Sequence, residues 1–156
     1  MASYANTIAS AVVSVIQGLA TPPAQTVLRK FDTLLLPDKS LASNIVCIVT
    51  LSQEQAIVNQ SFGNGSTDFG TVVRAYLIGI TLFKLHNATL QTNVDSLPAM
   101  ALSIEQALNK PSLAGASSVV DTMLEPFTEF EQGNFKDGYE VMKCHVVFMS
   151  AENRNS

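Results

Sequence analysis

The alternation of apolar and polar residues along the chain predicts two helices and several strands. A first helix is expected over Tyr4–Ala20, where apolar residues recur three or four positions apart and would form one face. The Thr-Pro-Pro sequence that follows should end it, because proline cannot continue the hydrogen bonds of a helix. A second helix is expected over Leu97–Asn109, with Ser96 as its cap.

The middle of the chain predicts a long β-hairpin. Two runs rich in Val, Ile, Phe and Tyr, Ala56–Phe62 and Thr71–His86, flank a loop of turn residues, Gly63–Gly70. The second run is long enough to project from a small domain as an arm. The loop carries little apolar surface to hold it down, so we expect it to be mobile in an isolated subunit.

Four further segments are expected to be strands. Thr26–Leu36 has no cleanly apolar face, which favours an edge position, whereas Asn44–Leu51 is continuously apolar and is typical of a central strand covered on both faces. Val119–Glu131 and Tyr139–Ser150 would form a closing hairpin. Pro126 lacks a backbone N–H, and it therefore predicts an edge or a bend in the first of these two strands.

This order of elements predicts an α+β fold. Helices that interrupt a mostly antiparallel sheet, each with one apolar stripe, are expected to pack together on one face of that sheet. The length of 156 residues fits a single domain over residues 1–156. Residues 150–156 are mostly polar, and we expect a disordered tail over this segment, frayed from Ala151 onward.

Composition and charge favour an assembled protein that does not bind nucleic acid specifically. Hydrophobic residues make up 47% of the chain and charged residues 14%, so few charges are available to cover the surface of a monomer. The net charge is −4, and no run of basic residues could neutralise a row of phosphates. A modestly acidic surface would let DNA pass close by without sticking.

Two features bear on the compartment. No run reaches the roughly 20 apolar residues that span a bilayer, and the N-terminus lacks the basic region of a signal peptide, so a cytoplasmic origin is expected. Cys47 and Cys144 each lie in an apolar run. We expect both to be buried, reduced and functionally silent, in preference to a disulfide or a redox pair.

The sequence shows no catalytic constellation. Neither His86 nor His145 has other metal ligands at a suitable spacing, so each is expected to be solvent-facing or hydrogen-bonded. The segment Phe62–Thr67 resembles a phosphate-binding loop, but it lacks the following Lys and leads into a strand. We therefore expect no catalytic residues, no metal and no cofactor, and a protein that is not an enzyme.

Acidic residues gather around the predicted closing hairpin. The residues concerned are Glu125, Glu129, Glu131 and Asp137. A solvated face is the first interpretation of such a group, and an acidic contact surface is the second.

The order of elements resembles that of the tail terminator (tail completion) proteins of long-tailed bacteriophages. The similarity lies in the amphipathic first helix, the long central hairpin, a helix of the SLPAMALSIEQALNKP kind and a closing strand like YEVMKCHVVF. It extends over nearly the whole chain as a pattern of elements and lengths, without signature residues. Related neck and head–tail joining proteins share the pattern in part.

The resemblance implies a structural role in the virion. Family members form a homo-oligomeric ring, usually hexameric, that caps the tail tube, stops its polymerisation and joins the tail to the head connector. The expected partners are therefore other copies of the chain, the tail tube protein and the connector or neck protein. DNA would pass through the lumen without specific binding, and no membrane is involved. The expected location is the tail or neck of the virion, after assembly in the host cytoplasm.

The long hairpin is the expected site of contact between subunits. The candidate interface residues are Phe62, Phe69, Tyr76, Ile78 and Phe83. For Tyr76, Ile78 and Phe83 the alternative interpretation is that they are inward-facing strand residues of the core.

Two other classes of function stay open at the level of sequence. One is a small α+β ligand-binding module, in which sheet and helices would enclose an apolar pocket. The other is an enzyme whose site carries no recognisable motif. A stable monomer with a large cavity would indicate the first, and a tightly bound metal or an unusually titrating histidine would indicate the second.

Overall fold

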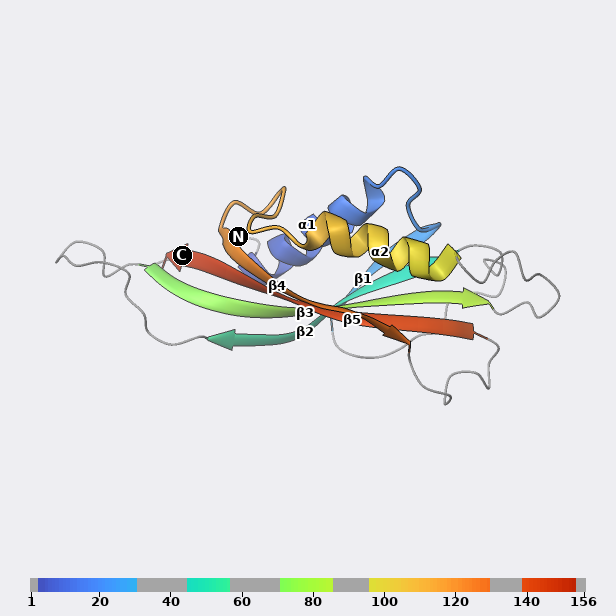
Figure 1. Ribbon diagram of the computed structural model, residues 1–156. Helices are drawn as coiled ribbons and strands as arrows, with labels where there is room; N and C mark the ends of the chain where they lie inside the picture. The colour runs from blue at the N-terminus through green and yellow to red at the C-terminus, as the bar shows by residue number, and fades with distance from the viewer. Residues whose placement is uncertain (1–2, 31–44, 57–70, 86–95, 130–138, 154–156) are drawn as a thin grey trace.

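The structure is a computed structural model that describes residues 3–30, 45–56, 71–85, 96–129 and 139–153. In these residues two helices lie on one face of a five-stranded sheet (Figure 1). The elements in chain order are α1 (Tyr4–Gln17), β1 (Gln25–Lys30), β2 (Val46–Ala56), β3 (Thr71–Leu85), α2 (Ser96–Leu108), β4 (Val119–Glu129) and β5 (Tyr139–Asn153). The predicted α+β class is confirmed.

Helix α1 begins and ends on local hydrogen bonds. The side chain of Ser3 accepts from the backbone N–H of Asn6 at 3.2 Å, which satisfies one of the free donors of the first turn. At the other end the N–H of Gly18 donates to the carbonyl of Ser14 at 3.0 Å. The helix therefore ends at Gln17, three residues before the predicted end at Ala20.

The strands are ordered β1-β2-β3-β5-β4 across the sheet. β1 and β2 are parallel, and the other three neighbouring pairs are antiparallel. β3 pairs with β5 along its whole length, from Thr71 opposite Asn153 to Leu85 opposite Tyr139. The two longest strands thus form the centre of the sheet, and β1 and β4 are its edges.

The predicted hairpin is present, but its first strand lies earlier in the chain than expected. β2 is continuous from Val46 to Ala56 and pairs with β3, with a register shift between Leu51 and Gln53. The segment Asn44–Leu51 lies mostly in an interior strand that is buried on both faces, as expected, but this strand is also the first half of the hairpin and not a separate one. Residues 57–70, which include the rest of the predicted first strand and its loop, lie outside the described residues.

The two edge strands, β1 and β4, can be compared with the strands that the sequence predicted for the same segments. β1 covers six residues, and the remainder of the segment Thr26–Leu36 lies outside the described residues. β4 is an edge strand whose register shifts between Glu125 and Thr128, around Pro126. The edge position and the irregularity that Pro126 predicted are both confirmed.

The expected frayed tail from Ala151 is wrong for residues 151–153. β5 continues to Asn153, and Glu152 is only 6% exposed. The strand continues because β3 offers pairing partners as far as Thr71, opposite Asn153. Backbone groups at the end of β5 therefore have partners in the sheet instead of water.

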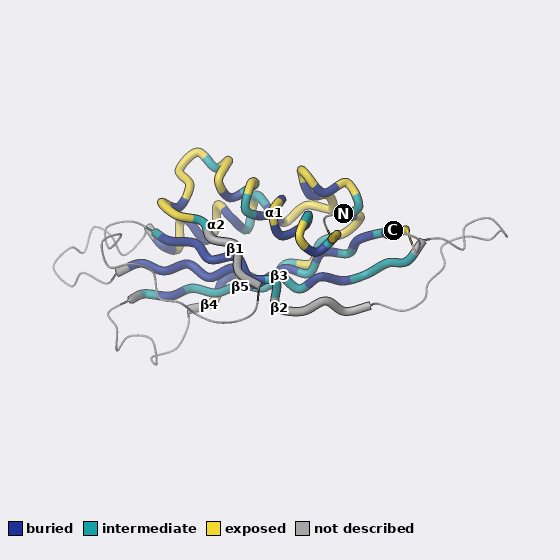
Figure 2. The backbone as a smooth tube through the Cα atoms, turned by 180° about the vertical axis from the view of Figure 1, so that it is seen from behind, coloured by how far each residue is buried: buried dark blue, intermediate teal, exposed yellow. Residues whose placement is uncertain are grey.

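The main core lies between the helices and the sheet. Figure 2 shows buried segments where the helices meet the strands. Every second residue of the central strands faces this layer, as the pleat of a strand requires. The fully buried side chains include Ile8, Val12, Ile16, Val49, Ile78, Ile80, Leu82, Ile104, Leu108, Val146 and Phe148.

A smaller buried cluster occupies the other face of the sheet. It consists of Val46, Ile48, Phe83 and Val141, which alternate along their strands with residues of the main core. The central strands are thus apolar on both faces. The sequence of such a strand is a continuous apolar run, as it is in the segment that contains β2.

Both cysteines are buried and free, as predicted. Burial raises the pKa of the Cys47 thiol to about 12, because the charged form would lose its hydration. Burial, with the nearby Cys47 as a second cause, raises the pKa of Cys144 further. Neither thiol is a nucleophile at neutral pH.

Candidate interaction surface on the sheet

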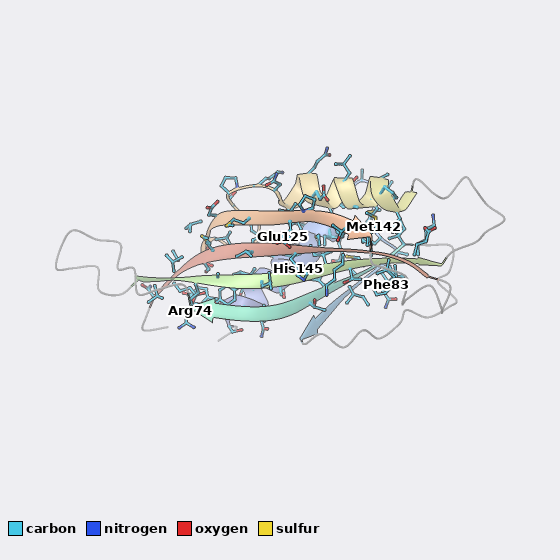
Figure 3. The ribbon with its side chains drawn as sticks, turned by 60° about the horizontal axis from the view of Figure 1, so that its bottom comes forward. Arg74, Phe83, Glu125, Met142 and His145 are labelled. Carbon is cyan, nitrogen blue, oxygen red and sulfur yellow. The ribbon has the colours of Figure 1, made fainter. Side chains whose placement is uncertain are left out.

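One face of the sheet carries no helix in the part of the chain that the structure describes. Both α1 and α2 pack on the opposite face (Figure 1). Figure 3 looks at the helix-free side, where His145 of β5 and Glu125 of β4 lie on neighbouring strands. Of the described residues on this face, Glu125 is exposed, whereas Val46, Ile48, Phe83 and Val141 are buried.

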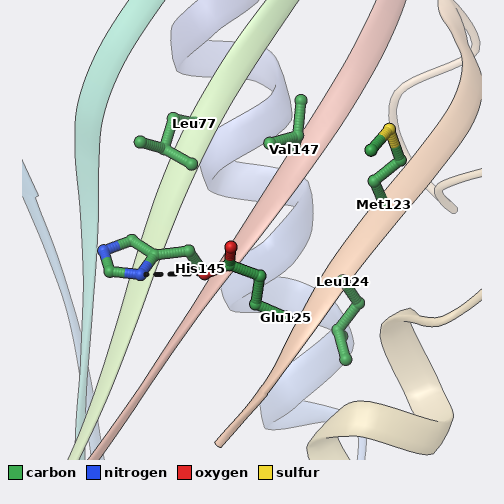
Figure 4. A pocket seen from close by; sticks show the side chains of 6 residues that line it. All are labelled: Leu77, Met123, Leu124, Glu125, His145 and Val147. Carbon is green, nitrogen blue, oxygen red and sulfur yellow. Dashed lines mark ion pairs between the residues drawn. The ribbon is translucent and has the colours of Figure 1, made fainter.

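A groove of about 290 Å³ lies at the β4 side of the sheet (Figure 4). It is lined by Leu77, Met123, Leu124, Glu125, His145 and Val147. The lining residues come from three neighbouring strands and are mostly apolar. This volume is at the lower limit of sites that hold small molecules.

The polar end of the groove is formed by His145 and Glu125. Their Nδ1 and Oε2 atoms are 3.8 Å apart, and the side chains are 35% and 82% exposed. Water screens a pair that is this exposed, so it contributes little to stability. A solvent-facing or paired His145 is what the sequence predicted.

Among the groove residues that the structure describes, no cluster of metal ligands is seen. Among the described residues no group of three or more His, Cys, Asp or Glu side chains could hold a metal ion. The lining of the groove contains no Ser, Thr, Cys or Lys that a His–Glu pair could activate as a nucleophile.

The edge strand β4 combines exposed apolar and acidic side chains. Val120 and Met123 are 53% and 58% exposed, and the acidic residues Asp121 and Glu125 are exposed beside them. Large apolar side chains grouped at an edge beside a groove are typical of an interaction site. Beside the acidic residues of β4 the structure thus exposes apolar side chains, which the sequence alone did not indicate.

The backbone of β4 is protected against the addition of another strand. The N–H of Thr122 donates to Oδ1 of Asp121 at 2.8 Å, and the N–H of Phe127 donates to Oε1 of Glu105 at 2.6 Å. Pro126 has no N–H to offer. Charges, a proline and a bulge are the usual means of protecting a sheet edge. A partner would therefore contact this edge through side chains.

A second polar cluster joins the ends of β3 and β5. Tyr76 donates a hydrogen bond from its hydroxyl to Oε1 of Glu152, and Nε of Arg74 lies 3.3 Å from Oε2 of the same carboxylate. Glu152 and Tyr76 are 6% and 2% exposed. Both carboxylate oxygens thus have partners, which is what burial of a charged group requires. The sequence pattern did not indicate this cluster, although the period-two pattern of β5 continues to Glu152.

The predicted interface residues fall into two groups. Tyr76 and Ile78 are buried in the main core, and Phe83 is buried in the cluster on the other face. Exposure was expected only if these residues were not part of the core, and the structure shows the alternative interpretation, inward-facing strand residues. Phe62 and Phe69 lie outside the described residues, so their role stays a prediction.

Comparison with known proteins yields a likeness in structure. No family model and no curated protein matches the sequence. A chain of the virion of a native gene transfer agent (GTA) particle superposes with a TM-score of 0.56 at 15% identity, over 98% of this chain and 99% of that one. A sheath/tube terminator of an extracellular contractile injection system, PVC, in its extended state, gives a TM-score of 0.46 at 14% identity, over 94% of this chain and 57% of that one.

The first of these likenesses extends over both chains nearly end to end. At 15% identity it shows a shared fold, and that fold occurs in a virion. The resemblance predicted from the order of elements is thus confirmed at the level of fold.

No helix among the described residues is long and apolar enough to cross a membrane.

Proposed function

We propose that this protein is a structural component of a virion that forms a closed ring at the end of a tail tube. The ring stops polymerisation of the tube protein and joins the tail to the head connector. The observation that carries the proposal is the fold shared with a virion chain over 98% of this chain and 99% of that one. The protein has no enzymatic role in this proposal.

The surface chemistry supports assembly. A ring built head to tail needs two different surfaces on each copy that fit each other, and further surfaces for the tube and the connector. Only 14% of the residues are charged, and β4 exposes Val120 and Met123. The net charge of −4 favours a lumen that DNA can cross without being held.

The groove on the helix-free face favours one alternative, a ligand-binding module. Its apolar walls and single polar end have the make-up of a small-molecule site. Assembly distinguishes the two functions, because a ligand-binding module has no need of a ring. A stable monomer that binds a small apolar molecule would favour the alternative.

The ring is tested by two measurements on the purified full-length chain. Native mass spectrometry gives the number of subunits, and electron microscopy gives the length of tail tubes polymerised in vitro with and without the protein. We expect a single ring species, in solution or on tubes, and shorter tubes when the protein is present. A chain that stays monomeric at high concentration and leaves tube length unchanged would contradict the proposal.

A further inference from the structure

The groove at the β4 side of the helix-free face has apolar walls and an acidic rim (Figure 4). Its lining contains four apolar side chains, one carboxylate and one imidazole, and no Lys or Arg. Met123 is 58% exposed, so the apolar wall on β4 is open to a partner. The groove therefore offers apolar contact beside negative charge.

The spacing of the acidic residues along the rim is fixed by the strand. Asp121, Met123 and Glu125 are alternate residues of β4, and the pairing with β5 has no register shift between them. Alternate residues of a strand point to the same face, so the two acidic residues flank Met123 on the side of the groove. Both are exposed. Four residues of an extended strand span about 13 Å, which sets the separation of the two charges along the rim.

No Lys or Arg side chain among the described residues pairs with either of these carboxylates. The neighbour of Glu125 is His145, and the 3.8 Å between Oε2 and Nδ1 is longer than a hydrogen bond. Asp121 accepts from the backbone N–H of Thr122 through Oδ1. Lys143 alternates with His145 along β5 but does not line the groove. The negative charge of the rim is therefore left for a partner to balance.

We propose that this groove binds an extended segment of a partner protein in which two Lys or Arg residues, four positions apart, flank an apolar residue. Two extended chains have nearly the same rise per residue, so cations four positions apart match the two acidic residues of the rim. The apolar residue between the cations covers Met123. The stems of the cationic side chains lie on the apolar walls, as those of Lys and Arg do on apolar surface. This inference goes beyond the proposed function and does not depend on the ring.

The partner segment is held by side chains, without pairing of strands. The N–H groups of Thr122 and Phe127 already donate to carboxylates of the same chain. Pro126, between them, has no N–H. An added strand would therefore meet few free donors along β4. Recognition depends on charge and apolar contact, and both can be removed one side chain at a time.

A series of short peptides tests this recognition on the unaltered full-length protein. The probe is the acetylated and amidated peptide Lys-Ser-Leu-Ser-Lys, and NMR of the Met, Leu and Val methyl groups follows its binding. We expect the methyl signals of Met123, Leu77 and Val147 to shift with a dissociation constant on the order of 1 mM, because so small a contact is weak. The peptide Glu-Ser-Leu-Ser-Glu should not bind.

Two further peptides separate the contributions of charge and spacing. An exposed ion pair strengthens binding about two- to fivefold. The neutral peptide Ser-Ser-Leu-Ser-Ser lacks both cations and should bind on the order of tenfold more weakly than the probe. The peptide Lys-Lys-Leu-Ser-Ser has the charge of the probe but not its spacing. It should bind about two- to fivefold more weakly, because only one cation then reaches an acidic residue.

Substitutions in the protein test the same contacts from the other side. Glu125→Gln and Asp121→Asn should each weaken binding of the probe about two- to fivefold, and together on the order of tenfold. The matched control is Glu140→Gln, which removes the same charge from β5 opposite Lys84. Position 140 lies about 17 Å along the strand from His145, so this variant should bind the probe as the unaltered protein does.

Several results would overturn the inference. They are equal binding of the Lys and Glu peptides, equal binding of the two Lys spacings, and unchanged binding by the double variant. Methyl shifts confined to residues outside the groove, or no shifts at about 10 mM probe, would also overturn it. Equally tight binding of the neutral peptide would identify the groove as an apolar site without a role for charge. None of these results bears on the ring, which subunit number and tube length test separately.

Discussion

Removal of one hydroxyl group should weaken the attachment of the end of β5 to the sheet. Tyr76→Phe keeps the aromatic ring in the core but deletes the donor that binds Oε1 of Glu152. Tyr76 is 2% exposed and Glu152 is 6% exposed, so water cannot readily replace the lost hydrogen bond. Arg74 remains at 3.3 Å from the other carboxylate oxygen, so the charge keeps one partner.

The magnitude follows from the kind of hydrogen bond. A hydrogen bond to a charged group contributes about 1.5–3 kcal/mol to stability. The change from Tyr to Phe leaves a void of a single oxygen, so the cavity contribution is small. We therefore expect Tyr76→Phe to lower the free energy of unfolding by about 2 kcal/mol.

Urea unfolding of the proteins of a double-mutant cycle measures the free energy of the hydrogen bond between Tyr76 and Glu152. The second substitution, Glu152→Gln, keeps an oxygen that can accept from Tyr76 but removes the charge. In that background Tyr76→Phe should cost about 1 kcal/mol, because a neutral hydrogen bond is weaker than a charged one. The urea m-value should stay constant, so that the shift in midpoint reports stability.

Two results would refute the reasoning. A cost of less than about 0.5 kcal/mol for Tyr76→Phe would show that the hydroxyl contributes little. If Tyr76→Phe lowers the free energy of unfolding equally with Glu and with Gln at position 152, the hydrogen bond from the hydroxyl does not depend on the charge of that residue. In either case the end of β5 would be held by the ladder with β3 alone.

The remaining predictions concern the two buried cysteines and Gly115. Neither Cys47 nor Cys144 should react with a thiol reagent in the folded protein, and rapid labelling would contradict their burial. Replacement of either cysteine by Ala should lower the free energy of unfolding in urea by about 1–2 kcal/mol. Burial raises the pKa of both thiols, so their contribution to stability is complete below a pH of about 9 and falls as the pH rises further. At pH 10 the loss should be about 1.4 kcal/mol per thiol. Unfolding measured at pH 8 and at pH 10 tests this difference. Gly115→Ala should cost about 1–2 kcal/mol, because Gly115 has a φ of 87° and its added Cβ would lie 3.4 Å from Cβ of Ala11. The control Gly18→Ala, at a φ of −81°, should cost less in the same thermal melts, and equal costs would contradict the argument.

The sequence by itself determined the elements that depend on local periodicity. Apolar residues three or four apart set the stripe of α1, and the helix begins within one turn of Ser3, whose side chain caps it. Alternation in β5 and the position of Pro126 in β4 likewise followed from properties of neighbouring residues. These signals are local, because a helix or strand face is defined within a few residues of the chain.

Pairing and burial were decided by tertiary structure. The apolar run of β2 was compatible with a separate central strand or with one half of a hairpin, and the register with β3 selected the hairpin. Tyr76 and Ile78 were equally compatible with an interface and with a core. Strand periodicity shows that a strand has two faces, but the packing of α1 and α2 determines which of these faces is covered.

The placement of charge shows the same division. The polar residue Glu152 looked like part of a solvated tail, yet it is buried because Tyr76, 76 positions earlier in the chain, and Arg74 supply its partners. The sequence contains the acidic residues of β4 and the basic residues of β1, but the strand order makes both strands edges, at opposite ends of one sheet. Contacts between residues so far apart in sequence depend on how the whole chain folds, so no local pattern determines them.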